Sequence, residues 1–278
     1  MMTELPPRRR ALRWTLAIGA AVMAGWAISG TGVGPASLLA GREGAADIIS
    51  GLFPPDLDGD LLSRVAVAAL ETVQISVAAM VLSMAIGLPL ALLIAANVEA
   101  PRWISGVARG TATLLRSVHE LLWALLFVAA VGLGPAAGVY AIGLHSAGVV
   151  AKLCSEQLEA VDRAPVETMK LTGGSRLTCA LLGILPQARA NIASQLLYQW
   201  ECAIRSSIVI GFVGAGGIGQ ALAIALRLFR YQELATLIAA VAILVVCVDR
   251  MSKSLRGRLG ATTRWMAPVR PSYERSTP

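Results

Sequence analysis

The stretch VQISVAAMVLSMAIGLPLALLIAA, residues 73–96, carries no charged side chain from end to end. A helix needs about 20 consecutive apolar residues to cross the hydrocarbon core of a bilayer. This stretch meets that length, and Pro89 within it is expected to kink the helix. The stretch therefore predicts a membrane-spanning helix, and it decides the class of the fold.

The composition of the whole chain agrees with a membrane protein. Its 278 residues are 56% hydrophobic and 15% charged, and the mean hydropathy is +0.67. A soluble domain of this size carries about 25% charged residues. The four cysteines lie far apart without a C-x-x-C spacing, so we expect neither a disulfide framework nor a metal site.

Further apolar stretches predict an all-α protein with about six transmembrane helices. The predicted spans are residues 12–29, 73–96, 111–131, 135–153, 190–213 and 234–248. The first stretch also has the character of a signal peptide. Because no clear A-x-A cleavage site follows it, we interpret it as an uncleaved anchor.

Most of the 24 Lys and Arg residues gather on one side of the predicted membrane. They lie before the first span, between the second and third, between the fourth and fifth, and after the sixth. Cytoplasmic segments of membrane proteins are enriched in Lys and Arg. Both termini and the long segment before the fifth span are therefore predicted to be cytoplasmic. The net charge of +7 has the same explanation, so we infer no nucleic-acid partner.

The stretch IGFVGAGGIGQAL, residues 210–222, contains the spacing G-x-G-x-x-G. In a dinucleotide-binding fold this spacing follows a strand and precedes an acidic residue by about 20 positions. Here a long apolar run precedes it and no β-α-β alternation surrounds it, so no dinucleotide site is predicted. Two interpretations stay open: a tight turn between helices, or a flexible gate at the mouth of a translocation path. The glycines concerned are Gly214, Gly216, Gly217 and Gly219.

The segment SEQLEAVDRAPVETMKLTGGSRLTCALLGILPQARANI, residues 155–192, is long and densely charged for a connection between spans. Residues 164–172 predict a short helix that Gly173 and Gly174 end. Ser175 is expected to cap a second helix that reaches about residue 182. The first helix has one apolar face, so it can dock a soluble partner or lie on the lipid surface.

The same segment resembles the coupling loop of ABC-importer permease subunits. That loop is written E-A-A, three residues, Gly, nine residues, I-x-L-P. The residues that match its spacing are Glu167, Gly173, Leu185 and Pro186. The chain departs from it at Thr168 and Met169, which replace the two alanines, and at Gly183, which replaces the usual Ile.

Three further stretches resemble the phosphonate-transporter permease subunits of that superfamily. They are RSVHELLWALLFVAAVGLGPAAGV (116–139), YQWECAIRSSIVIGFVGAGGIGQ (198–220) and VDRMSKSLR (248–256). The resemblance covers residues 65–256, a permease domain. Residues 1–64, an anchor helix and external loop, and residues 257–278, a cytoplasmic tail expected to be disordered, fall outside it.

The resemblance implies a multi-pass subunit in the bacterial cytoplasmic (inner) membrane. Two permease subunits, identical or paralogous, form the path through the bilayer, and an external binding protein delivers the substrate. Two ATPase subunits bind ATP and Mg, and each docks on a loop like this one. The chain itself has no G-x-x-x-x-G-K-[ST] motif, so it is not expected to hydrolyse ATP or to bind a cofactor. The coupling residues implied are Glu167, Met169, Gly173, Gly174, Leu185 and Pro186.

Two pairs of opposite charges lie inside predicted spans. Arg116 precedes Glu120 by four residues, and Glu201 precedes Arg205 by four. This spacing places each pair on one face of a continuous helix. An ionisable group near the bilayer centre costs about 2.5 to 3.5 kcal/mol, so it needs a partner or a wet cavity.

Two interpretations of these pairs stay open. Each pair can neutralise itself and hold helices together. Alternatively, the charges with Ser206 and Ser207 form a polar path for an oxyanion, for which arginine offers planar, multiple donors. His145, in the fourth predicted span, is interpreted as a hydrogen-bonding residue between helices.

We therefore predict a type I ABC importer permease subunit, without catalytic residues, for phosphonate or a related phosphorus oxyanion such as phosphate or phosphite. The alternative is an ion-coupled secondary transporter that works without an ATPase. Secondary transporters are characterised by inverted repeats and broken helices, and neither feature is clear in the sequence.

Overall fold

The computed structural model of the chain describes residues 7–31, 42–98, 100–175 and 178–259, and within them it contains helices joined by turns and no strands. This confirms the predicted all-α class. The chain divides into two units, residues 1–54 and residues 55–278. Most of the predicted tail, from residue 260 onward, lies outside the described residues.

The first unit contains two helices, α1 (Pro7–Thr31) and α3 (Arg42–Gly51). The first predicted span lies within α1. The side chains of residues 13–30 are all exposed in this unit, among them Trp14 and Trp26. The 25 residues of this helix suffice for the length that a membrane anchor requires.

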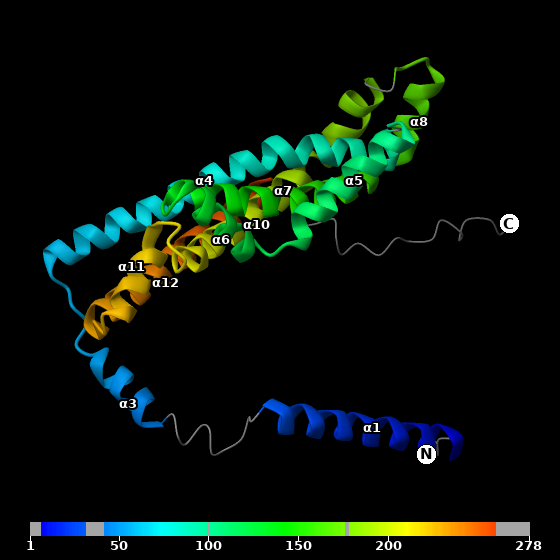
Figure 1. Ribbon diagram of the computed structural model, residues 1–278. Helices are drawn as coiled ribbons and strands as arrows, with labels where there is room; N and C mark the ends of the chain where they lie inside the picture. The colour runs from blue at the N-terminus through cyan, green and yellow to red at the C-terminus, as the bar shows by residue number, and fades with distance from the viewer. Residues whose placement is uncertain (1–6, 32–41, 99, 176–177, 260–278) are drawn as a thin grey trace. The chain divides into compact units, whose positions relative to one another are not determined.

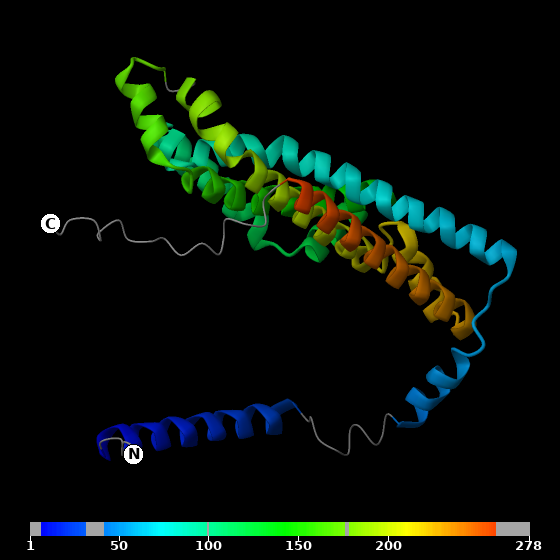
Figure 2. The same cartoon turned by 180° about the vertical axis from the view of Figure 1, so that it is seen from behind.

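The second unit is a bundle of helices (Figure 1). Its elements are α4 (Gly59–Ile94), η1 (Ala96–Val98), α5 (Arg102–Ser117), α6 (Glu120–Val131), α7 (Pro135–Glu159), α8 (Arg163–Leu171), η2 (Cys179–Ile184), α10 (Leu185–Gly211), α11 (Gly217–Arg227) and α12 (Tyr231–Arg258). The view from behind agrees with the first in placing α8 and α11 at opposite ends of this bundle (Figure 2). The helix α4 runs along its length and continues through Pro89.

Among the described residues, α4, α7 and α12 are each long and apolar enough to cross a membrane. The pair α5 and α6 makes a fourth span if it is counted as one, but the two helices are bent by 85° at their junction. The expectation of a continuous helix over residues 111–131 was therefore wrong. The total of about six spans stays a prediction, in which α10 takes the place of the fifth.

The helix α7 lies at the centre of the bundle and packs against α4, α5, α6 and α10. Its buried positions are rich in Gly, Ala and Ser, which let neighbouring backbones approach closely. A Cβ atom at Gly148 would lie 2.6 Å from the carbonyl oxygen of Ala112 on α5. A Cβ atom at Gly143 would lie 2.6 Å from the side-chain Cδ2 of Leu82 on α4. The bundle is thus held together by backbone proximity around small residues.

The predicted second helix of the central segment does not end before the fifth span. The π-helical segment η2 leads directly into α10, and the Leu185 N–H donates to the carbonyl of Ala180, five residues earlier. Proline has no N–H to donate and its ring clashes with the carbonyl four residues before it. The wider π-helical turn just before Pro186 accommodates both the missing N–H and the bulk of the proline ring. One continuous helix therefore links the central segment to the bundle.

Candidate functional site

The short helix α8 ends at the glycines expected from the sequence, and it begins at an N-cap residue, Asp162, that was not predicted. The Asp162 carboxylate accepts a hydrogen bond from the Ala164 N–H at 3.1 Å. At the other end, the N–H groups of Gly173 and Gly174 donate to the carbonyls of Lys170 and Met169. Gly173 has φ +87°, the left-handed conformation that this type of helix end requires. The helix is therefore stopped sharply at the position that the sequence predicted.

The inner face of α8 packs on the start of the π-helical segment. Val166 is buried and Met169 is partly buried in a cluster with Cys179 and Ile184. A Cβ atom at Gly183 would lie 3.1 Å from the Met169 sulfur. The larger residue at 169 thus occupies space that a side chain at 183 would need. The two departures from the coupling-loop pattern, Met169 for Ala and Gly183 for Ile, compensate each other sterically.

The outer face of α8 is open. Leu171 is 89% exposed, and Glu167 is exposed beside a polar hollow of about 230 Å³ that Asn97, Arg163 and Lys170 also line. Leu171 and Glu167 are therefore accessible to a partner protein. Of the predicted coupling residues, Glu167 and Gly173 lie on the surface, whereas Met169 faces inward.

The glycine-rich stretch is a turn between two helices, α10 and α11, and no strand precedes it. This agrees with the rejection of a dinucleotide site. Gly214, Gly216 and Gly217 have φ values of +93°, +85° and +68°, which favour glycine. A Cβ atom at Gly219 would lie 1.9 Å from the Ile208 carbonyl oxygen. Each of these glycines is therefore required by the turn geometry or by close packing.

Two side chains of α4 hold this turn, and the sequence analysis missed both. The Glu71 carboxylate accepts from the Gly217 N–H at 3.1 Å, and the Thr72 hydroxyl accepts from the Ile218 N–H at 2.9 Å. They satisfy free N–H groups at the start of α11, as an N-cap does. The only sequence signal was a Glu-Thr pair just before the charge-free stretch of the second span.

The first predicted charge pair is divided between two helices. α5 ends one residue after Arg116 and α6 starts at Glu120, with the 85° bend between them. His119 caps α6, because its Nδ1 accepts from the Leu121 N–H at 3.2 Å. Arg116 and Glu120 therefore do not share a helix face, and the expectation of an i,i+4 pair was wrong. Glu120 instead accepts a hydrogen bond of 2.5 Å from the Ser206 hydroxyl of α10.

The second predicted pair lies on one helix, but its carboxylate has another partner. Glu201, 7% exposed, forms an ion pair with Arg256 near the end of α12, with an N···O distance of 2.5 Å. Arg205 is exposed, and its Nη2 lies 3.4 Å from the Cys202 sulfur. The interpretation of Glu201 and Arg205 as a self-neutralising pair was therefore wrong. Arg256, 55 positions further on, could not be identified as the partner from spacing.

Ser207 is the last residue of the predicted path, and other polar side chains of the bundle, outside that path, bond between helices. The Ser207 hydroxyl is buried without a hydrogen-bond partner in the described part of the chain. His145 Nδ1 lies 2.9 Å from the Val118 carbonyl at the α5–α6 junction, as expected of a residue that bonds between helices. The Gln199 amide donates to the Ser146 hydroxyl at 3.1 Å. Arg116 and Arg205 are thus the exposed donors of the predicted path.

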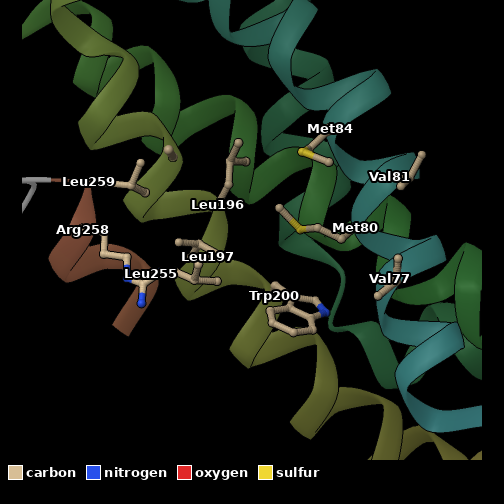
Figure 3. A pocket seen from close by; sticks show the side chains of 11 residues that line it. Val77, Met80, Val81, Met84, Leu196, Leu197, Trp200, Leu255, Arg258 and Leu259 are labelled. Atoms are coloured by element: carbon tan, nitrogen blue, oxygen red, sulfur yellow. The ribbon is translucent and has the colours of Figure 1, made fainter. Parts of the chain in front are cut away.

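A wide groove of about 550 Å³ lies between α4, α10 and the end of α12 (Figure 3). Met80, Met84, Leu196 and Trp200 point into it, and Arg258 is the one charged residue among the described residues that line it. An oxyanion site needs several converging donors. This groove lacks them, so it does not belong to the predicted anion path.

Comparisons with known proteins identify the family. Residues 87–260 match the family described as binding-protein-dependent transport system inner membrane component. The chain is 38% identical over 221 residues to the phosphite transport system permease protein of Stutzerimonas stutzeri, which covers 79% of each protein. It is 31% identical over 230 residues to the phosphate-import permease protein of Mycolicibacterium smegmatis, which covers 82% of this chain and 42% of that protein.

Solved structures share the fold. A chain of the MetNI methionine ABC transporter superposes with a TM-score of 0.63 at 18% identity, covering 72% of this chain and 97% of the other. A chain of an amino acid ABC transporter gives 0.59 at 19% identity, covering 73% and 99%. The chain belongs to the family of binding-protein-dependent transport system inner membrane components.

Proposed function

We propose that this chain is the permease subunit that carries a phosphorus oxyanion, such as phosphite, phosphate or a phosphonate, after an external binding protein has delivered it. The observation that supports this most is the identity of 31 to 38% to permease proteins named for phosphite and phosphate transport. The exposed guanidinium groups of Arg116 and Arg205 suit such a substrate, because arginine binds tetrahedral oxyanions through several donors at once.

Uptake by intact cells tests the substrate. The chain is expressed with its ATPase and binding protein in cells that lack their own phosphorus-oxyanion transporters. We expect uptake of radiolabelled phosphite or phosphate above that of cells without the chain, and growth on the transported compound as sole phosphorus source. Uptake of an unrelated solute, with none of any phosphorus oxyanion, would contradict the proposal.

We infer that α8 is the docking helix for an ATPase subunit that holds ATP and Mg, and that two such ATPases serve two permeases, identical or paralogous. In this arrangement both termini and α8 lie on the cytoplasmic side. The support comes from the sharp capping of α8 and the exposure of Glu167 and Leu171. Gly174, Leu185 and Pro186 position the helix, because they form its end and the continuous helix that follows.

Cysteine cross-linking in the assembled complex tests this docking. Leu171→Cys should cross-link to the ATPase, whereas Val166→Cys, on the same helix but buried, should not. The structure makes Leu171 a sharper probe than Met169, since Met169 faces η2. Labelling of Leu171→Cys from outside intact cells would reverse the predicted orientation.

We propose that Arg205 faces the path between two permeases. It lies on a stripe of α10 with the exposed Tyr198 and Val209, and an exposed guanidinium facing lipid would be unfavourable. Glu120, Glu201, Ser206 and Ser207 then act as supports behind the path, because each is at least partly buried. Arg116 continues the path at the α5–α6 junction.

For the turn at Gly214–Gly219 we propose a gate that opens when the Glu71 and Thr72 hydrogen bonds break; a plain tight turn remains the alternative. Gly216→Val is a poor test, because φ +85° strains any side chain there. Thr72→Val removes one acceptor at nearly constant volume. A gate predicts altered uptake per assembled complex, whereas a plain turn predicts lower stability with unchanged uptake per complex.

A further inference from the structure

A small polar cavity of about 170 Å³ lies between α5 and α7, beside the last residue of α4. Arg109, Thr113 and Arg116 line it from α5, and Lys152, Ser155 and Glu159 line it from α7. Residues spaced by three or four positions share one helix face. Each helix thus turns one polar face toward the other, in a bundle whose packing is otherwise mostly apolar.

The charges of this cavity do not cancel within the chain. Glu159 accepts from the Ala96 N–H at 2.9 Å, and Lys152 is paired with Glu156 at 3.0 Å. Arg109 makes a hydrogen bond of 3.5 Å to the Ile94 carbonyl. Arg116 has neither a side-chain hydrogen bond nor an ion pair among the residues that the structure describes. Three cations and one carboxylate therefore line the cavity, and one guanidinium is unengaged.

The walls of the cavity are set by rigid contacts. Ala112 is buried beneath the cavity. A Cβ atom at Gly148 would lie 2.6 Å from the Ala112 carbonyl oxygen and 2.8 Å from the backbone nitrogen of Arg116. This close approach fixes the separation of the two helices next to the cavity. The backbone of Arg116 is consequently held close to α7, and Arg116 and Lys152 both line the cavity.

We propose that this cavity is a binding site for a tetrahedral oxyanion, formed by Arg109, Arg116 and Lys152 with the Thr113 hydroxyl. The volume suffices for a phosphate-sized group, since one water molecule takes about 30 Å³. Guanidinium groups bind such an anion through parallel N–H···O bonds. The site deepens the proposed function by naming a second station for the anion, at the end of the bundle where α8 follows α7, and in that sense rests on it.

A tetrahedral oxyanion can reach this cavity in two forms, as a free anion or as the phosphate of an anionic lipid headgroup. Binding of radiolabelled inorganic phosphate is measured with the full chain in nanodiscs of phosphatidylcholine alone and in nanodiscs with phosphatidylglycerol. We expect saturable binding in the first. Unchanged binding in the second assigns the site to the free anion, whereas competition by phosphatidylglycerol assigns it to the headgroup phosphate.

Arg116→Gln should weaken phosphate binding at least tenfold, and Arg109→Gln should also weaken it. Arg102→Gln is the matched control, because Arg102 is an exposed cation of the same helix outside the cavity. Elution as a single species on size exclusion shows that each variant is folded, and Arg116→Lys gives a second variant with the charge retained. Equal binding by Arg116→Gln and the unchanged chain, or no saturable binding in either nanodisc, would overturn the proposal.

Uptake in cells separates this inference from the proposed function. If the unchanged chain supports uptake of phosphite or phosphate but binds no phosphate in the cavity, only the cavity site is refuted. If phosphate binding depends on Arg116 but no phosphorus oxyanion is taken up, the site stands and the proposed transport function is refuted.

Discussion

The two charge clusters that the sequence predicts inside the membrane have the same spacing in the sequence and different structures. Arg116 and Glu120 are separated by a bend of 85°, whereas Glu201 and Arg205 lie on the continuous helix α10. In both clusters the carboxylate bonds to a residue on another helix, Ser206 or Arg256, and the arginine has no carboxylate partner among the described residues. Spacing of four therefore identifies which residues are polar inside the bundle, but not which of them pair.

The largest expected effect concerns the Glu201–Arg256 ion pair. Glu201→Gln leaves Arg256, with 19% of its side chain exposed, without its carboxylate, and should destabilise the folded chain by about 3 kcal/mol. Thermal unfolding of the detergent-solubilised chain measures this loss. The double change Glu201→Gln with Arg256→Gln should recover a large part of it.

The matched control for that recovery is Glu201→Gln with Arg205→Gln. The structure predicts no recovery in this double variant, because Arg205 does not pair with Glu201. If Arg205→Gln restored stability and Arg256→Gln did not, the partner assigned to Glu201 would be wrong.

Arg205→Lys separates the role of this arginine from a structural role. The charge is kept but the planar fork is lost. Loss of a charge-assisted hydrogen bond to the substrate is worth about 1.5 to 3 kcal/mol, so uptake should fall about ten- to hundredfold. Thermal stability should stay unchanged, since no carboxylate depends on Arg205. Normal uptake by Arg205→Lys would count against a direct contact with the anion.

A double-mutant cycle tests the hydrogen bond between Glu120 and Ser206 in the first cluster. Glu120→Ala and Ser206→Ala each remove one partner of the 2.5 Å hydrogen bond between α6 and α10. We expect a coupling of about 1.5 kcal/mol in thermal stability between the two changes. Arg116→Ala combined with Glu120→Ala should show no coupling, and a clear coupling there would mean that Arg116 and Glu120 pair despite the bend.

The smallest effect is expected for substitutions of His119, which lies at the bend between α5 and α6. His119 caps α6, so His119→Ala should lower stability by about 1 kcal/mol. His119→Asn should retain stability, because asparagine is a preferred N-cap residue. Both are compared by thermal unfolding, and equal losses in the two variants would show that the cap does not stabilise the start of α6.

Much of the second unit could be predicted because it depends on local chemistry. The end of α8 follows from Gly173, whose left-handed backbone conformation is a local preference of glycine. The spans α4, α7 and α12 follow from long apolar runs. The α5–α6 bend was not predicted, because Ser117, Val118 and His119 contain neither Pro nor Gly to mark a break.

The helical, membrane-spanning class of the protein, the apolar stretches of α4, α7 and α12, and the glycine end of α8 all follow from the sequence alone. These features depend on hydropathy and capping, which act over short distances along the chain. The three-dimensional packing of the helices was needed to show that Glu201 pairs with Arg256, that Glu71 and Thr72 hold the turn before α11, and that Arg116 lines a cavity with Lys152. Such contacts join residues far apart in the sequence, and they are set by which helix faces the close packing around α7 brings together.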